Sequence, residues 1–405
     1  MNFLFVHQNF PGQFRHVARA LAEMPQHRVV GIGETVNLES RPSVHPAITV
    51  IGYRLKQGSG EGTHHYIRDF EAAIRRGQEV ARIAIELKKK GFFPDVVTSH
   101  PAWGESLFLR DIFPDARHIN YFEYYYRSTG GDVGFDAEFP STFDDRFRIR
   151  IKNSTQLHAL ESADAGISPT CWQQSLYPKE YLQKIRIIHE GIDTRLIVPD
   201  PEASIELEGH VFRHGDKVVT YVSRNLEPYR GFHIFMRTLP LIQERCPDAR
   251  IIVVGGDGVS YGRKLPEGKT YRSIYREELE GRVDWSKVHF TGKLPYNKYI
   301  SILQLSSAHV YLTYPFVLSW SMLEAMAAGC VVIGSDTAPV QEVIKHGENG
   351  LLTDFFDSER LAVTIGEVVA KPSQYEGIRK AARKTIIEKY DLKTRCLPEM
   401  LNYLT

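Results

Sequence analysis

Two arginines stand close together in the second half of the chain, in the segment SRNLEPYRGFH at residues 223–233. Arg224 and Arg230 follow an apolar, strand-like run, and Gly231 opens a helical pattern. A guanidinium presents a fork of N–H donors, so two of them at a strand end can bind a diphosphate, each charge-assisted bond contributing about 1.5–3 kcal/mol. The alternative is a surface arginine paired with Glu227. A second helix start suited to phosphate, expected in the same sheet, favours the phosphate role.

A second polar group stands where another helix is expected to begin. Residues 308–340 read as strand, loop, helix, strand and loop, and Ser319 or Ser321 can cap the helix. The N-terminus of a helix carries unpaired N–H groups and the positive end of the helix dipole, which suits a phosphate. Glu324, one turn further on, could accept both hydroxyls of a ribose. From the residues alone it stays open whether the serines only cap the helix and Glu324 is a solvated acid.

Short apolar runs alternate with helical patterns along most of the chain, which predicts α/β folding with doubly wound parallel sheets. The first series of strands begins at residues 3–6 and ends near 185–189, and a second series begins at 218–222. Between them, HEGIDTRLIVPDPEAS is punctuated by glycine and proline and leads into polar sequence through residue 216. The sequence therefore predicts two similar domains, with a ligand in the cleft between them.

Composition excludes several classes of protein. Fifty basic and forty-nine acidic residues leave a net charge of +1, so no global charge favours nucleic acid as a partner. The four cysteines are far apart and predict buried, reduced thiols and neither a disulfide framework nor a zinc site. The opening MNFLFVHQNFPG reads as a first strand and not as a signal peptide, and nothing approaches the length of a membrane span. These features predict a cytoplasmic protein.

One long helical stretch, at about residues 65–90, carries basic residues every seven positions at Arg68, Arg75, Arg82 and Lys89. We expect a solvated face threaded with glutamates. Peripheral contact with an anionic membrane, at its inner face, is the alternative.

Several segments together resemble a known family. LEAMAAG at 323–329 and the following SDTAPVQEVIKHGENGLL are similar to the donor-binding half of retaining glycosyltransferases of family 4, the glycosyl transferases of group 1. The first half resembles the family more loosely, in NFPGQFRH at 9–16, PDVVTSH at 94–100 and HEGID at 189–193. The resemblance implies the GT-B fold, two Rossmann-like doubly wound parallel-sheet domains facing each other across a cleft.

The resemblance also implies a division of labour. Residues 1–195 would form the N-terminal acceptor-binding domain, residues 196–385 the domain for the nucleotide-sugar donor, and residues 386–405 a C-terminal helix returning to the first domain. The activity would be transfer of a sugar from a nucleotide-diphosphate donor to an acceptor hydroxyl with retention of anomeric configuration, in polysaccharide or glycoconjugate synthesis. We expect a UDP-sugar as co-substrate, with a GDP-sugar as the alternative. Glycan, lipid-linked and small-molecule acceptors all stay open.

Carried over residue by residue, the resemblance assigns a catalytic and a donor-binding set. His100 would lie at the donor sugar, and Arg224 and Arg230 would stabilise the charge that develops on the leaving diphosphate. The donor-binding set comprises the glycine loop, the flanks of the base, the diphosphate contacts, the ribose carboxylate and the residue at the sugar: Gly12, Leu294, Tyr296, Ser319, Trp320, Ser321, Glu324 and Phe316. The backbone of Gly12 would let its loop approach the phosphates closely.

Three positions depart from the family pattern. Arg230 replaces a lysine, which keeps the charge and adds a fork of donors. Phe316 replaces the glutamate that normally contacts the hydroxyls of the donor sugar. Ser319, Trp320 and Ser321 replace an apolar segment at the diphosphate.

The acceptor is expected against the long aromatic loop at residues 122–141, with Glu123, Tyr126 and Asp132 as its wall. No D-x-D triplet occurs, so a carboxylate-bound divalent metal is not expected. A dehydrogenase is disfavoured because HQNFPGQ has one glycine instead of G-x-G-x-x-G. An epimerase or phosphorylase of the same fold, and a non-catalytic nucleotide-sugar-binding homologue, stay open.

Overall fold

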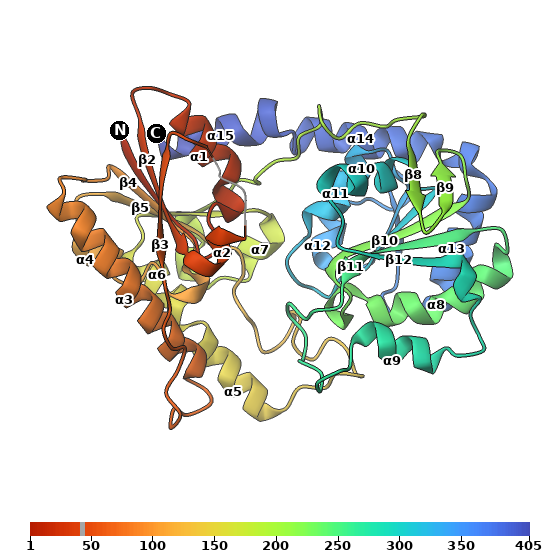
Figure 1. The fold of residues 1–405 in the computed structure, drawn as a ribbon, viewed down its shortest axis with the longest axis horizontal. Helices are drawn as coiled ribbons and strands as arrows, with labels where there is room; N and C mark the ends of the chain where they lie inside the picture. Colours follow the sequence, from red (N-terminus) through yellow and green to blue (C-terminus); the bar gives the residue numbers. More distant parts are fainter. Residues whose placement is uncertain (41–44) are drawn as a thin grey trace. The chain divides into compact units, whose positions relative to one another are not determined.

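Two parallel sheets organise the chain, and each belongs to a separate unit (Figure 1). The computed structural model describes residues 1–40 and 45–405. Unit 1 comprises residues 1–191 and 393–405, and unit 2 comprises residues 192–392.

Unit 1 contains a seven-stranded sheet in the order β3-β2-β1-β4-β5-β6-β7, and all neighbouring strands are parallel. Its strands are β1 (Asn2–Val6), β2 (Arg28–Glu34), β3 (Ile48–Tyr53), β4 (Val96–Ser99), β5 (Arg117–Tyr121), β6 (Ala165–Ser168) and β7 (Ile185–Ile187). The strand order reverses between β1 and β4. The loops after these two strands therefore lie at the switch point, where open α/β sheets bind ligands.

Helices cover both faces of this sheet because alternate residues of its strands are buried on opposite sides. Phe3 and Phe5 of β1 pack with α1 (Arg15–Ala22) and α15 (Leu397–Leu404), whereas Leu4 and Val6 pack with α3 (Arg68–Lys89) and α4 (Leu109–Ile112). The remaining helices are α2 (Thr35–Glu39), α5 (Phe143–Lys152), α6 (Ser154–Ser162) and α7 (Cys171–Ser175). The last helix of the chain, α15, thus completes the core of unit 1.

Unit 2 contains a six-stranded parallel sheet in the order β12-β11-β10-β13-β14-β15. Its strands are β10 (Val218–Asn225), β11 (Arg250–Gly256), β12 (Val288–Gly292), β13 (Ala308–Tyr311), β14 (Val332–Ser335) and β15 (Leu351–Thr353). Here the order reverses between β10 and β13. These are the strands that precede Arg230 and Ser319.

The helices of unit 2 also lie on both faces. One face packs against α10 (Tyr296–Gln304), α11 (Trp320–Ala327) and α14 (Glu376–Lys389). The other is covered by α8 (Phe232–Arg245) and α13 (Ser358–Ala370), with α9 (Tyr271–Glu278) against α8. The short α12 (Ala338–Gln341) follows β14. Two Rossmann-like parallel-sheet domains are thus confirmed.

One element departs from the sequence-based expectation. The polar stretch expected to continue the linker forms an antiparallel hairpin of β8 (Ser204–Leu207) and β9 (His210–Arg213). Its inward residues, Ile205 and Phe212, join the core of unit 2. The charged residues between them hid this alternation.

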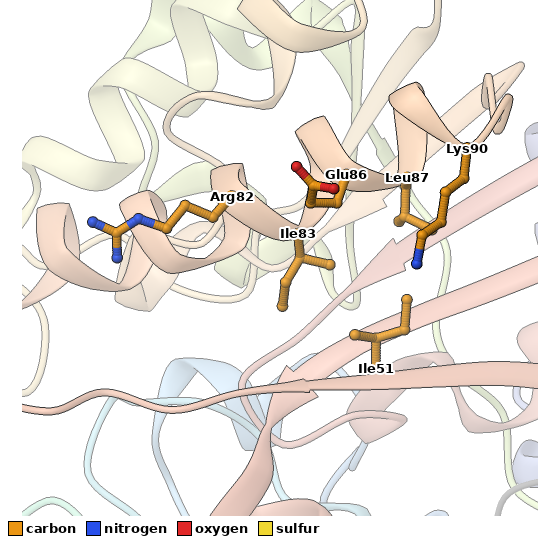
Figure 2. Close-up of a pocket in the computed structure, with 6 residues that line it drawn as sticks. All are labelled: Ile51, Arg82, Ile83, Glu86, Leu87 and Lys90. Atoms are coloured by element: carbon orange, nitrogen blue, oxygen red, sulfur yellow. The ribbon is translucent and has the colours of Figure 1, made fainter.

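Surface features of the long helix α3 favour the solvated interpretation of its basic series. Arg75, Arg82 and Lys89 each form an ion pair with a glutamate of the same helix, three or four residues away. An open surface pocket of about 250 Å³ lies between the last turns of α3 and β3, lined by Ile51, Arg82, Ile83, Glu86, Leu87 and Lys90 (Figure 2). Because α3 runs antiparallel to the strands, its C-terminal turns lie away from the edge that carries the candidate residues.

The structure tests the predicted burial of the cysteines and the expected lack of a membrane-spanning helix. Cys246, Cys330 and Cys396 are buried, but Cys171 at the start of α7 is exposed, so the prediction of four buried thiols is wrong for that residue. Within the described ranges, no helix combines the length and the apolarity that crossing a bilayer requires.

Candidate functional site

Arg230 lies at the carboxyl edge of the sheet in unit 2, on the short helical turn that follows β10, and only 9% of its surface is exposed. Its Nη1 donates hydrogen bonds to Thr313 Oγ1 at 2.8 Å, to the Val317 carbonyl at 2.8 Å and to Tyr311 Oη at 3.3 Å. The Nε and Nη2 groups donate to no other residue in the described part of the chain. One corner of the guanidinium is therefore fixed by protein, and the rest can donate to a ligand.

The start of α11 lies against the same tyrosine. The backbone amide of Ser319 donates to Tyr311 Oη at 2.8 Å, so Arg230 and the helix start share one hydroxyl group. Ser319 also caps α11, because its Oγ accepts a hydrogen bond from the Ser321 amide at 3.3 Å. Ser319 therefore both caps α11 and lies near the Arg230 guanidinium. Trp320, between the two serines, is 42% exposed. The hydroxyl of Tyr311 connects Arg230 to the start of α11, and the sequence did not suggest this residue.

Arg224 lies in a stretch of β10 where the pairing with β11 changes register, between Val222 and Asn225. Bulged stretches of this kind turn side chains away from the regular pleat. The Arg224 side chain is exposed and makes no hydrogen bond or ion pair with another described residue. It is an exposed cation at the edge that carries Arg230.

Glu324 is held by two tyrosines of α10. Tyr296 Oη donates to Oε1 at 2.6 Å, and Tyr299 Oη donates to Oε2 at 2.7 Å. Tyr299 is buried, and burial together with the Glu324 carboxylate raises its pKa well above the usual value, whereas Tyr296 is 48% exposed. Leu294, just before α10, is half-buried against the core. The buried Tyr299 thus orients the Glu324 carboxylate. The sequence did not suggest Tyr299.

Phe316 and Glu227 are both buried beside the loop that carries Arg230. Phe316 is 2% exposed, and its ring lies 5.3 Å from the ring of Tyr229 and 4.8 Å from that of Tyr261. Glu227 is 1% exposed and accepts hydrogen bonds from the backbone amides of residues 260–262. The alternative in which Glu227 pairs with one of the arginines is therefore wrong.

Gly12 lies in unit 1, in the loop after β1, with a positive φ of 49°. A Cβ atom at this position would lie 2.5 Å from the His7 ring, so packing within unit 1 already requires glycine here. The need for glycine at residue 12 is therefore explained by the neighbouring His7 ring, without a bound phosphate.

His100 follows β4 across the switch point from the Gly12 loop. It is 1% exposed, its ring stacks on Trp103 at 4.6 Å, and its Nε2 lies 3.4 Å from Glu123 Oε2. Gln13, in the loop after β1, bonds to the same carboxylate, because its Nε2 donates to Glu123 Oε1 at 2.6 Å, and its Oε1 lies 2.8 Å from His7 Nε2. The structure thus brings together residues that the sequence analysis had divided between donor and acceptor.

The other two predicted acceptor residues are placed differently. The Tyr126 ring faces the ammonium of Lys152, which lies 4.0 Å from its centroid. Asp132 is 3% exposed and accepts a hydrogen bond from Tyr124 Oη at 2.9 Å. Asp132 therefore orders the aromatic loop from inside, and its role in acceptor binding stays a prediction.

Among the described residues, no group of three or more histidine, cysteine, aspartate or glutamate side chains is placed to hold a metal ion. Metal independence itself stays a prediction.

Family models match most of the chain in two consecutive parts. The model described as "Glycosyl transferase family 4 group" matches residues 25–197, and "Glycosyl transferases group 1" matches residues 204–385.

Individual relatives match at lower coverage. The chain is 23% identical over 213 residues to the GDP-mannose-dependent alpha-(1-6)-phosphatidylinositol monomannoside mannosyltransferase of Mycolicibacterium smegmatis, covering 51% of this chain and 52% of the relative. It is 24% identical over 248 residues to the mannosylfructose-phosphate synthase of Agrobacterium fabrum, covering 60% and 52%. The matched region thus spans about half the length of these relatives.

Solved structures match over the full length. Sucrose-phosphate synthase from Thermosynechococcus elongatus aligns with a TM-score of 0.74 at 17% identity, covering 100% of this chain and 98% of that one. HepE from Anabaena, in complex with UDP-glucose, aligns with a TM-score of 0.68 at 16% identity, covering 100% and 99%. At these identities the likeness shows the fold. Taken with the two family models, it means that the chain belongs to the family 4 glycosyltransferases and has the GT-B fold.

Proposed function

We propose that this protein transfers a sugar from a nucleotide-diphosphate donor to an acceptor hydroxyl, with retention of anomeric configuration. Unit 2 binds the donor through Arg224, Arg230, the start of α11 and Glu324. Unit 1 binds the acceptor and supplies His100 at the donor sugar. Synthesis of a polysaccharide or glycoconjugate in the cytoplasm is the process that we favour.

The observation that carries this proposal is the contact between Arg230 and the helix start. Arg230 Nη1 and the Ser319 amide both bond to Tyr311 Oη, at the switch point of unit 2. These bonds fix the guanidinium, so its Nε and Nη2 donors need no reorganisation when negative charge develops on a leaving diphosphate. Arg224, exposed at the same edge, adds a second cation that can follow the phosphate.

Two finer points follow from this charge distribution. Two guanidiniums can supply the positive charge that a divalent cation supplies in other sites, so we propose a metal-independent reaction. For retention we favour attack on the same face of the sugar, assisted by the leaving phosphate.

The relatives suggest classes of donor. We favour UDP-sugars, in keeping with the UDP-glucose complex of HepE, whereas the mycobacterial relative is named for GDP-mannose. Glycans, lipid-linked glycans and small molecules remain the acceptor classes. Contact of α3 with an anionic membrane is the weaker prediction for that helix, because three of its four basic residues are paired with glutamates.

Acceptor-dependent release of nucleoside diphosphate tests the proposal. The purified protein is incubated with UDP- and GDP-sugars and a panel of acceptors, and free diphosphate is measured. We expect release to require an acceptor and Arg224→Ala to lower kcat/KM about 10- to 100-fold, since one charge-assisted bond is lost. Arg213→Ala, at another exposed arginine of unit 2 that lies on β9, should leave the rate unchanged. Equal rates for both variants would contradict the proposal.

A second candidate is a non-catalytic nucleotide-sugar-binding homologue. The buried Phe316, in place of a carboxylate at the sugar, favours it. Tight donor binding without release of diphosphate for any acceptor would support this alternative. An epimerase or phosphorylase would instead convert the donor without an acceptor hydroxyl, or with inorganic phosphate as the acceptor.

A further inference from the structure

A buried carboxylate fixes one loop beside the candidate diphosphate site. Glu227 follows β10, and its carboxylate accepts hydrogen bonds from three successive backbone amides, those of Ser260 at 3.1 Å, Tyr261 at 3.0 Å and Gly262 at 2.8 Å. Such a run of N–H groups forms an anion-binding nest. Asn225 Nδ2 adds a bond to Ser260 Oγ at 2.7 Å. The loop after β11 is thus fastened to the loop that carries the two arginines.

The fastened loop presents one aromatic side chain to solvent. Tyr261 is 38% exposed, whereas Phe316 beneath it is 2% exposed, and their rings meet at 4.8 Å with an angle of 62°. With Tyr229, whose ring lies 6.1 Å from that of Tyr261, they form a cluster that we term the aromatic wall. The Tyr261 hydroxyl makes no hydrogen bond to another described residue. Tyr229 is half-buried, so the Tyr261 ring is the most exposed part of the wall.

The wall also contacts the cation. The Arg230 guanidinium carbon lies 5.7 Å from the centroid of Tyr261 and 5.8 Å from that of Phe316. A diphosphate on Arg230 carries the nucleoside at one end and the sugar at the other. Glu324 is held by α10, on one face of the sheet, whereas the loop of Tyr261 leads to α9 and α8 on the other face. A donor with its ribose on Glu324 therefore directs its sugar toward the aromatic wall.

We propose that the aromatic wall is the donor-sugar subsite, with Tyr261 as its specificity-determining residue and Glu227 as a positioning residue. This inference rests on the proposed function and names the class of sugar. A phenol ring over a buried phenylalanine offers stacking to C–H groups and no charged acceptor for hydroxyls. The subsite therefore selects a sugar with an apolar face, and a 6-deoxyhexose donor binds at least as tightly as its hydroxylated counterpart.

Calorimetric titration of the intact protein separates this inference from the function on which it depends. The ligands are UDP, UDP-glucose and UDP-6-deoxyglucose, with GDP, GDP-mannose and GDP-6-deoxymannose as the second series. If the wild-type protein binds none of the six, the proposed function fails and this inference with it. If it binds the diphosphates, the ratio of affinities for nucleotide sugar and bare diphosphate measures the sugar subsite alone.

Two substitutions then test the residues. Tyr261→Ala should lower the affinity for the nucleotide sugars about 3- to 10-fold, the range of aromatic stacking, and change diphosphate affinity less than twofold. Tyr261→Phe should retain the wild-type ratio. Glu227→Gln should lower the same ratio and accelerate amide exchange at residues 260–262, while leaving diphosphate affinity nearly unchanged. Equal losses for sugar and bare diphosphate in Tyr261→Ala, no loss for either, or weaker binding of both deoxy donors would overturn the proposal.

Discussion

The two units have sheets of the same design but different chemistry at the point where the strand order reverses. In unit 2 the loops after β10 and β13 bring together Arg230, Tyr311 and the amide of Ser319. In unit 1 the loops after β1 and β4 meet a carboxylate, with His7, Gln13 and His100 around Glu123. Topology thus selects the place, and residue type decides whether it suits an anion or a neutral hydroxyl-bearing ligand.

The contrast predicts that removing the buried cation has the largest effect, confined to unit 2. Arg230→Met deletes three hydrogen bonds and leaves Thr313 and the Val317 carbonyl without their donor. We expect a loss of about 2–4 kcal/mol in the free energy of unfolding of unit 2 and at least 100-fold weaker UDP binding.

Urea unfolding and calorimetry measure both effects. Arg230→Lys, which keeps the charge and loses the fork, serves as the intermediate case and should recover part of the affinity. If Arg230→Met bound UDP as tightly as the wild-type protein, the proposed difference between the two units would be contradicted.

The matching substitution in unit 1 should act on turnover and leave nucleotide binding intact. His100→Asn removes the ring that stacks on Trp103 beside Glu123. We expect kcat to fall about 10- to 100-fold, with less than a twofold change in the affinity for UDP, as for a group that acts in the transition state. His118→Asn is the control, because His118 is also buried but lies near the amino end of β5. A large loss of UDP affinity in His100→Asn would contradict the division of roles.

Acid should destabilise both units through buried histidines. Burial lowers the pKa of His309 in unit 2 to about 3 and that of His189 in unit 1 to about 4. The unfolded chain, with histidine near pKa 6.5, binds protons that the folded chain excludes, so stability is full above pH 6.5 and falls as the pH drops toward these values. For His309 the loss is about 2 kcal/mol at pH 5.

Urea midpoints at pH 8 and pH 5 measure this effect. In His309→Gln the difference between the two pH values should be smaller by that amount, whatever the variant's stability at pH 8. An unchanged difference would show that His309 does not exclude the proton.

The smallest expected effect concerns Glu324, the carboxylate that we propose binds the ribose. Tyr299→Phe removes the buried donor to Glu324 Oε2 and leaves the exposed Tyr296 in place. A net hydrogen bond contributes about 1 kcal/mol, so we expect UDP to bind about 3- to 10-fold more weakly. Tyr177→Phe in unit 1 is the control, because the buried Tyr177 hydroxyl has no hydrogen-bond partner within the described ranges. Equal UDP affinity in both variants would mean that Tyr299 does not orient the carboxylate.

Much of the fold could be predicted because its strands are short apolar runs separated by helical patterns. Arg230 and Ser319 could be placed because each lies between such a run and the helical pattern that follows it. The hairpin of β8 and β9 was missed because charged residues flank each inward side chain.

The contacts that complete the site could not be predicted from the sequence pattern. Glu227 bonds to amides more than thirty residues away, and such bonds leave no periodic pattern in the sequence. Tyr299 looks like one more apolar residue on the buried face of α10. Gly12 could be read as a phosphate-loop glycine, although the ring of His7 alone excludes any side chain there.

The central claim is that Arg224, Arg230 and the start of α11 bind the diphosphate of the donor. It is tested most directly by the difference in affinity between UDP and uridine, measured by calorimetry on the wild-type protein, Arg224→Ala and Arg213→Ala. We predict that UDP binds the wild-type protein at least 100-fold more tightly than uridine, that Arg224→Ala reduces this ratio about tenfold, and that Arg213→Ala preserves it. A UDP-to-uridine ratio near one in the wild-type protein, or the same ratio in both variants, would contradict the account.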